Sequence, residues 1–194
     1  MVIVFPAMTE ELVVLVDDHD NQIGTAPKSE VHHGDTPLHR AFSCFLINAE
    51  GELLLQQRAS TKVTWPRIWS NSCCGHPLPG EPREEAVRRR LRDELGLEPR
   101  SLALALPDYR YRAEHLGVVE NEICPVWIGP VDNVPTLNEA EVMAVRWVSW
   151  RRFIRGVRDG SEPFYRDLSP WCREEALLLD DKGVLDALVR SENR

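Results

Sequence analysis

The chain has 194 residues, 43% of them apolar, and a formal net charge of −8 at pH 7. This size and composition allow one hydrophobic core, so we expect a single domain over 1–194. The acidic balance argues against a broad nucleic-acid surface, which needs a basic stripe, but a few arginines can still hold a small anionic ligand. Five cysteines, two of them adjacent, indicate a reduced cytoplasmic protein rather than a disulfide framework.

The N-terminal residues 1–9 are expected to form a flexible tail. Their apolar run has no basic segment before it, and Glu10 and Glu11 interrupt it, so it does not resemble a signal peptide. No apolar run approaches the length of a membrane span. We therefore expect a cytoplasmic monomer or weak dimer that binds neither membranes nor nucleic acid.

The first third of the chain is predicted to form strands around a histidine-bearing loop. Residues 12–16 read as a strand that turns through Asp and Asn residues into a second short strand. Residues 28–39 carry Gly, Asp and Pro together with three histidines, which predicts a loop. Two apolar segments, 41–47 and 52–57, flank a turn at 48–51 and predict a hairpin.

A helix is predicted over 82–96. Pro82 suits the first helical position, two glutamates follow it near the positive end of the helix dipole, and Gly96 supplies a stop. At about 100° per residue, one apolar stripe runs along the helix. The stripe consists of Val87, Leu91 and Leu95.

Glu94 is the exception on this helix, because it points to the inward side with Arg90 beside it. A carboxylate aimed inward costs free energy unless it is paired or holds a metal. An ion pair with Arg90, four residues earlier, and a functional role are both compatible with this position.

The second half of the chain mixes strands and helices without regular alternation. Strands are predicted at 108–114, 117–129 and 143–150, and helices at 150–160 and 169–181. This order favours an α+β protein, an α/β/α sandwich with a mixed sheet flanked by helices.

Three histidines and two glutamates form a candidate metal site. Period-two alternation places Glu120 and Glu122 on one face of a strand, where two carboxylates repel each other unless a cation or a shared proton relieves them. With His32, His39 and His76 they make a reasonable nitrogen and oxygen site for a divalent transition metal. A solvated strand edge and solvated loop histidines are the alternative.

Cys74, in "NSCCGHP", has several possible roles. It lacks the Cys-x-x-Cys partner of a structural zinc site, but His76 could serve it as a base if it were a nucleophile. As a general acid it needs no activation, because an ordinary thiol is protonated at neutral pH. The remaining alternative is a small buried hydrophobe, which we expect for the other four cysteines: Cys44, Cys73, Cys124 and Cys172.

From Gly75 the chain reads Gly, five residues, Glu81, seven residues, then "RRLRDELGL". This segment, 75–97, resembles the Nudix box, a loop–helix–loop that binds diphosphates through carboxylate-held divalent metal. The resemblance implies the Nudix fold. One position departs from the pattern, because Arg90 stands where the box has a glutamate, and this argues against ordinary pyrophosphate hydrolysis.

The surrounding segments "LHRAFSCFLINAEGELLLQQRA", "WPRIWSNSCCGHP", "DYRYRA", "VENEICPV" and "LSPW" resemble the type 1 isopentenyl-diphosphate Δ-isomerase family over 28–171. The resemblance implies isomerisation of isopentenyl diphosphate to dimethylallyl diphosphate through a carbocation, with a small-molecule prenyl diphosphate as substrate. It assigns proton transfer to Cys74, Glu122 and Tyr111. It implies metal ligands at His32, His39, His76, Glu120 and Glu122. Substrate-binding residues would be Lys28, Arg58, Lys62, Arg90 and Trp171.

The same resemblance implies two metal ions. Mn²⁺, Zn²⁺ or Mg²⁺ would occupy the histidine site, and Mg²⁺ would arrive with the substrate diphosphate beside Cys74 and Glu94. Two alternatives stay open at this level: a Nudix hydrolase acting on a diphosphate, and an inert metal- or diphosphate-binding module on the same fold. The hydrolase needs the acid that Arg90 replaces, and the inert module has no use for Cys74 and Glu122 together.

Overall fold

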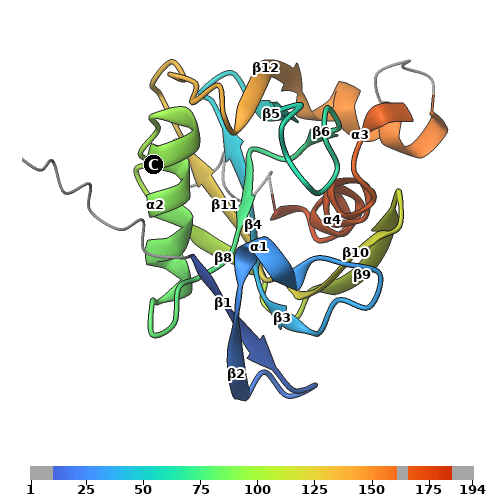
Figure 1. Cartoon of the computed structure of the whole chain (residues 1–194). Helices are drawn as coiled ribbons and strands as arrows, with labels where there is room; N and C mark the ends of the chain where they lie inside the picture. Colours follow the sequence, from blue (N-terminus) through green and yellow to red (C-terminus); the bar gives the residue numbers. More distant parts are fainter. Residues whose placement is uncertain (1–10, 161–165, 185–194) are drawn as a thin grey trace, which may run out of the picture.

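The computed structural model describes residues 11–160 and 166–184, so the predicted tail at 1–9 lies outside the described part. The strands are β1 Leu12–Val16, β2 Gln22–Pro27, β3 His39–Arg40, β4 Phe42–Ile47, β5 Glu52–Arg58, β6 Trp69–Ser70, β7 Cys73–Gly75, β8 Ala103–Leu106, β9 Arg110–His115, β10 Val118–Ile123, β11 Val126–Pro130 and β12 Val142–Ser149. The helices are α1 Lys28–Val31, α2 Arg83–Leu95, α3 Trp150–Asp159 and α4 Pro170–Asp181 (Figure 1).

The strands form two mixed sheets. The larger has the order β12-β5-β4-β11-β8, with β6 paired to β5 and β7 paired to β4. The smaller has the order β2-β1-β3-β10-β9. Parallel pairs join β4 to β11 and β3 to β10, while the other pairs are antiparallel. The predicted α+β class with a mixed sheet is confirmed.

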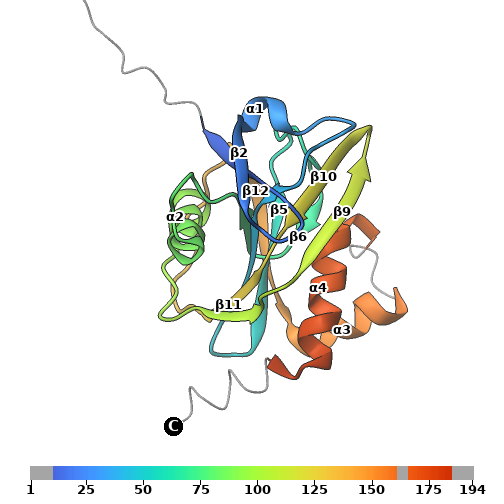
Figure 2. The ribbon, with the colours of Figure 1, turned by 90° about the horizontal axis from the view of Figure 1, so that it is seen from below.

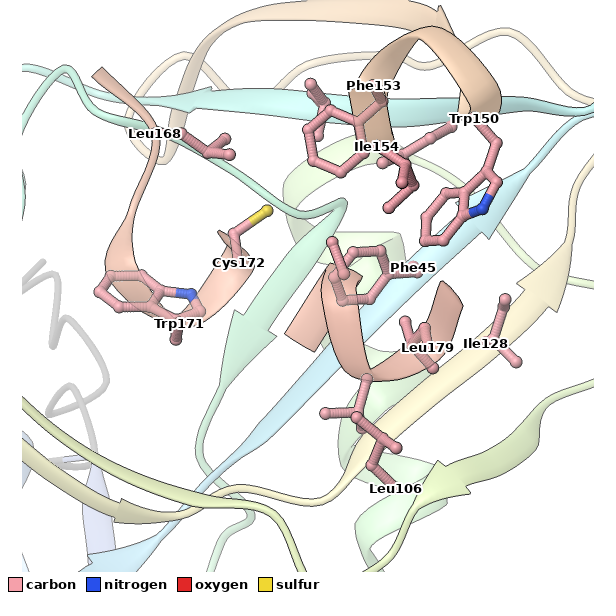
Figure 3. Close-up of a cluster of buried hydrophobic side chains, with 14 of the residues drawn as sticks. Phe45, Leu106, Ile128, Trp150, Phe153, Ile154, Leu168, Trp171, Cys172 and Leu179 are labelled. Carbon is pink, nitrogen blue, oxygen red and sulfur yellow. The ribbon is translucent and has the colours of Figure 1, made fainter. Parts of the chain in front are cut away.

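Helices cover both faces of the larger sheet. Cys44 and Leu46 of β4 pack in the core under α2, whereas Phe45 and Ile47, one residue out of phase, pack in the core under α3 and α4. Figure 2 shows α2 on one side of the strands and α3 with α4 on the other. Figure 3 shows Phe45 surrounded by apolar side chains from α3 and α4. The predicted α/β/α sandwich is therefore present.

Helix α2 follows the sequence signals closely. Pro82 precedes the first turn, and Gly96 ends the helix with φ +62°, a left-handed conformation that favours glycine. The amide of Gly96 donates to the carbonyl of Arg92, which satisfies one of the last carbonyl groups of the helix. The whole predicted apolar stripe is buried. No described helix is both long enough and apolar enough to cross a membrane.

Three predicted elements differ in the structure. The loop at 28–39 contains the short helix α1. The strand predicted over 117–129 divides into β10 and β11, which belong to different sheets, because Pro125 has no amide to continue the ladder. The hairpin over 41–57 pairs only at Ile47 and Leu53, beside the turn. Beyond that pair β4 and β5 diverge, and β7 and β6 fill the sheet between them. The sequence reading also missed the short strands β3, β6, β7 and β8.

Candidate functional site

A cavity of about 620 Å³ opens between α1, the β5 end, β7, β9 and β10. All the predicted site residues line it except His39 and Glu94, which are buried. The lining residues that the sequence predicted are Lys28, His32, Arg58, Lys62, Cys74, His76, Arg90, Tyr111, Glu120, Glu122 and Trp171. Side chains from segments more than a hundred residues apart in the sequence therefore line one cavity.

Four predicted metal ligands come together at one end of the cavity. Ligand atoms of His32, His39, His76 and Glu122 all lie within 4.8 Å of one another. The Nε2 atoms of His39 and His76 are 3.2 Å apart, and the Nε2 of His76 is 3.2 Å from Oε1 of Glu122. Two imidazole nitrogens and a carboxylate at these separations form a compact donor set for a divalent cation.

The fold explains why these residues meet. The parallel pairing of β3 with β10 places His39 directly opposite Glu122. His32 follows the last residue of α1, and His76 follows the last residue of β7. The sequence contains the donor residues, but the pairing of two distant strands brings them together.

The donor atoms are suited to a metal. The Nδ1 of His39 donates to the carbonyl of Pro37 at 2.9 Å, because that carbonyl can only accept, and this directs Nε2 into the cluster. The buried Nε2 of His32 has no hydrogen-bond partner among the described residues. Burial lowers the pKa of His32 to about 3 and that of His76 to about 4, so both rings are neutral at pH 7.

Glu122 is ionised in this setting. Burial alone would raise its pKa, but the hydrogen bonds that it accepts from His39 and His76 hold the pKa well below its usual range. Glu122 can therefore act as a carboxylate, either toward a cation or as a proton acceptor.

Glu120 lies in the same cavity but outside the four-residue cluster. Its Oε2 accepts a hydrogen bond of 2.7 Å from the hydroxyl of Tyr111. Burial, together with the charge of Glu122, raises the pKa of Glu120 to about 7. Burial and the charge of Glu120 also raise the pKa of Tyr111 well above its usual range, so the phenol keeps its proton.

Cys74 is a protonated thiol at the cavity wall. Its Sγ lies 3.0 Å from Oδ1 of Asn71 and 3.5 Å from Oγ of Ser43. Burial, followed by the charge of Glu175, raises its pKa to about 12. This disfavours the nucleophile and zinc-ligand roles, while a general acid and a buried thiol without a chemical role both fit a protonated sulfur. The prediction that Cys44, Cys73, Cys124 and Cys172 are buried thiols is confirmed.

The cavity wall also carries cations, and Lys28, Lys62 and Arg90 among them are paired with carboxylates. Nζ of Lys28 forms an ion pair with Oε2 of Glu11 at 2.9 Å, and Lys62 forms an ion pair with Glu141. Burial lowers the pKa of Lys28, and the nearby charges of Arg90 and Lys62 lower it further. Cations this close to one another make an anion-binding surface.

Arg58 differs from these cations. Its Nε and Nη2 donate to the carbonyl of Thr64, and Nη2 also donates to the Thr64 hydroxyl, so its guanidinium holds the loop at 59–68 beside the cavity.

The sequence analysis missed the two carboxylates Glu11 and Glu141. Each stands in a stretch with other acidic residues, "TEEL" and "NEAE", where nothing in the local pattern separates it from a solvated side chain. Glu141 reaches both Lys62 and Arg90, the latter at 3.2 Å. These contacts depend on tertiary structure, so no sequence signal could have found them.

Two aromatic rings, Tyr111 and Trp171, form part of the cavity wall. Tyr111 and Trp171 are stacked with ring centroids 5.3 Å apart and planes at 28°. Trp65, which the sequence did not single out, meets Trp171 edge-on at 5.2 Å. Tyr111 and Trp171 therefore give the cavity an aromatic part of its wall beside the metal cluster and the cations.

Residues 37–172 match the NUDIX domain family. A curated relative from Saccharopolyspora erythraea, named isopentenyl-diphosphate Delta-isomerase, is 50% identical over 175 residues, covering 90% of this chain and 88% of its own length. A second relative of the same name, from Agromyces mediolanus, is 49% identical over 96% of this chain and 90% of its own. The chain belongs to the isopentenyl-diphosphate Delta-isomerase family. The Nudix match and the buried cluster together indicate that this isomerase family member binds a divalent metal.

Solved structures agree on the fold. DR0079 from Deinococcus radiodurans superimposes with a TM-score of 0.63 at 21% identity, over 86% of this chain and 97% of that one. A MutT protein from Methanosarcina mazei Go1 gives 0.59 at 22% identity, over 76% of this chain and 96% of that one. At these identities the likeness concerns the fold alone, and it confirms the predicted Nudix fold.

Arg90, which stands where the Nudix box has a glutamate, forms a buried ion pair in this isomerase family member. Arg90 is buried and binds Glu94 through Nε at 3.0 Å and Nη2 at 2.6 Å, so the inward Glu94 forms the ion pair that its spacing allowed. Removing either partner of such a pair leaves a buried charge uncompensated. A cation thus stands where the box has a metal-binding acid.

Proposed function

We propose that this protein interconverts isopentenyl diphosphate and dimethylallyl diphosphate. The observation that carries the proposal is one cavity whose wall holds a protonated thiol, Cys74, an ionised carboxylate, Glu122, and several cations. The substrate class is a small prenyl diphosphate. The curated relatives of the same family bear the name of this activity.

The reaction needs both groups. The alkene must gain a proton at one carbon and lose one at another, and an unactivated alkene is a very weak base. An acid and a base therefore have to be held close to it in a pocket from which water is excluded. Cys74 holds a proton to give, and Glu122 is free to accept one. Tyr111, opposite Glu122 on the paired strand β9, lines the same cavity with a phenol that keeps its proton.

The apolar wall suits a carbocation. Water in contact with the tertiary cation would trap it as an alcohol, so the middle of the cavity has to be dry. The face of an aromatic ring such as Trp171 attracts a desolvated cation by roughly 2 kcal/mol. Trp171 is 1% exposed and stacks on Tyr111, which fixes the ring at the edge of the cavity.

The polar ends would position the substrate. We assign the diphosphate to Lys28, Lys62 and Arg90, with Arg58 holding the adjacent loop. Mg²⁺ arriving with the diphosphate would neutralise its charge beside Glu94 and Cys74. We assign Mn²⁺, with Zn²⁺ and Mg²⁺ as alternatives, to His32, His39, His76 and Glu122, with Glu120 adjacent. A metal at that site would fix Glu122 and tune its proton affinity.

The test is to incubate the purified protein with isopentenyl diphosphate and Mg²⁺ in D₂O. The isomerase transfers a solvent-derived deuteron to carbon, so deuterium-labelled dimethylallyl diphosphate is the expected product, detected by NMR and mass spectrometry. Release of phosphate or pyrophosphate without labelled product would instead identify a Nudix hydrolase and overturn the proposal.

Adding Mn²⁺ is expected to raise the Tm of the protein. A ligand that binds only the folded state stabilises it by RT ln(1 + [L]/Kd), which is about 2.7 kcal/mol at a free metal concentration about 100 times Kd. His39→Gln should lose this rise, because His39 is fully buried within the cluster. His19→Gln, a change at an exposed histidine, is the matched control and should keep it. A rise that is equal in both variants would place the metal elsewhere.

A further inference from the structure

Asn71 lies in the turn between β6 and β7 and is fully buried. Its Nδ2 donates two hydrogen bonds, to the carbonyl of Cys44 at 3.1 Å and to the carbonyl of Cys73 at 2.9 Å. Both partners can only accept, so the amide nitrogen must be the atom on this side. The two bonds attach the turn to β4 and to the start of β7.

The opposite end of the same amide faces three donors. Oδ1 of Asn71 accepts from Oγ of Ser70 at 2.8 Å, from Sγ of Cys74 at 3.0 Å and from Nε1 of Trp171 at 3.2 Å. An indole nitrogen can only donate, so the oxygen must be the atom on this side. The orientation of the amide is thus determined twice, independently, by groups whose hydrogen-bonding roles cannot change.

This arrangement fixes the thiol and the indole together. Because the Asn71 oxygen is an acceptor, the S–H of Cys74 is the donor in this 3.0 Å contact, which is shorter than the 3.5 Å contact of the same sulfur with Oγ of Ser43. The same oxygen accepts a hydrogen bond from the ring of Trp171, one hundred residues along the chain. Figure 3 shows this ring at the start of α4. A second contact, between Oγ of Ser70 and Oγ of Ser169 at 2.9 Å, ties the same helix start to β6.

We propose that Asn71 is a positioning residue for the isomerisation, which sets the Cys74 thiol and the Trp171 ring in one fixed relation to each other. The inference rests on the proposed function, in which Cys74 transfers a proton and Trp171 faces the cation that results. One buried oxygen holds both groups, so moving it displaces both. A misplacement of about 1 Å at a reacting centre costs on the order of 100-fold in rate.

Ser72 offers a matched comparison for a purely structural role. It lies next to Asn71 and is equally buried. Its Oγ accepts from the amide of Leu46 at 2.7 Å and donates to the carbonyl of Leu54 at 2.7 Å. It therefore holds the same turn to β4 and β5 through the backbone alone. Ser72→Ala measures what the loss of buried hydrogen bonds in this turn does by itself.

The first measurement is spectroscopic and does not depend on activity. In a ¹H–¹⁵N spectrum of the full chain, the indole resonance of Trp171 is identified as the one missing from Trp171→Phe. Asn71→Ala is expected to shift this resonance and to speed the exchange of its proton with solvent, because the acceptor is gone. Ser72→Ala should leave the resonance in place. An unmoved resonance in Asn71→Ala would overturn the inference.

The second measurement separates kcat from KM with isopentenyl diphosphate as substrate. Asn71→Ala is expected to lower kcat about 100-fold with little change in KM, because the diphosphate end of the cavity is untouched. Ser72→Ala should keep kcat near the wild-type value at a temperature where both variants are folded. An equal loss of kcat in both variants would show that Asn71 acts only through stability and would overturn the inference.

Asn71→Asp keeps the side-chain shape and an oxygen toward Cys74 and Trp171 but puts a second oxygen in place of the nitrogen that donates to two carbonyls. Circular dichroism therefore has to show that this variant folds before it is compared with Asn71→Ala. The folded variant is expected to keep the Trp171 resonance near its wild-type position and to retain more kcat than Asn71→Ala. Loss of both the Trp171 resonance position and the retained kcat in a folded Asn71→Asp would contradict the role of the oxygen.

The outcomes distinguish the two proposals. An inactive wild-type protein would overturn the proposed function, whereas an active wild type with an unaffected Asn71→Ala would overturn this inference alone.

Discussion

Cys74→Ala is expected to lower kcat for isopentenyl diphosphate by about 10³-fold while leaving the fold intact, because positioned acid–base groups typically contribute 10²–10⁴-fold. Cys74 lines the cavity, and the other four cysteines are fully buried away from it. No second thiol of the described residues could therefore take over its proton transfer. The measurement is the rate of deuterium incorporation into dimethylallyl diphosphate in D₂O, with circular dichroism to verify the fold.

Cys73→Ala is the matched control for this change. Cys73 is the adjacent residue, but its side chain lies in the core under α2, on the other side of the sheet from the cavity. We expect it to lower the free energy of unfolding by about 1 kcal/mol, a typical value for a core truncation of this size, and to leave kcat unchanged. Near-normal turnover in Cys74→Ala, or an equal loss in Cys73→Ala, would contradict the proton-transfer role of Cys74.

Glu122→Gln is expected to reduce isomerisation to a similar degree, by about 10³-fold in kcat. The amide has nearly the same shape as the carboxylate, but it carries no charge and cannot accept a proton at neutral pH. The change should also diminish the rise in Tm that Mn²⁺ produces, because Glu122 supplies the only carboxylate of the four-residue cluster found among the described residues. Turnover and the metal-dependent Tm are measured on the same preparation.

Glu114→Gln is the control for the loss of a glutamate charge. Glu114 lies on β9, the strand paired with β10, and is exposed. Neither kcat nor the metal-dependent Tm should change in this variant. If Glu122→Gln turned over at the wild-type rate, the assignment of Glu122 as a proton-transfer group would be wrong, whatever its effect on the metal.

Local signals predicted the elements whose cause is local. Helix α2 ends at Gly96 because a left-handed residue is needed there, and its buried stripe follows from a period of 3.6 residues. Glu120 and Glu122 share one strand face because side chains alternate with a period of two. In these cases the physical cause lies within a few neighbouring residues, so the sequence alone was sufficient.

Pairings between distant segments could not be predicted in this way. The loop expected at 28–39 includes α1, whose four residues are too few to show a helical period. The hairpin at 41–57 opens because β7 and β6 add to its two strands, and both come from a segment whose short strands carry no alternation of their own. The strand at 117–129 divides at Pro125, because a proline cannot donate to the ladder in the interior of a sheet.

The sequence by itself determined the chemistry that this protein carries: the donor residues, the thiol, the box with Arg90 in place of an acid, and the resemblance that joins them. Only the tertiary structure decided which of those groups meet. It placed His39 opposite Glu122 and paired Lys28 with Glu11 and Arg90 with Glu141. It also placed Asn71 between Cys74 and Trp171. The reason is physical: a residue type fixes which bonds a side chain can make, whereas the partner is chosen by strand pairing and burial across the whole chain.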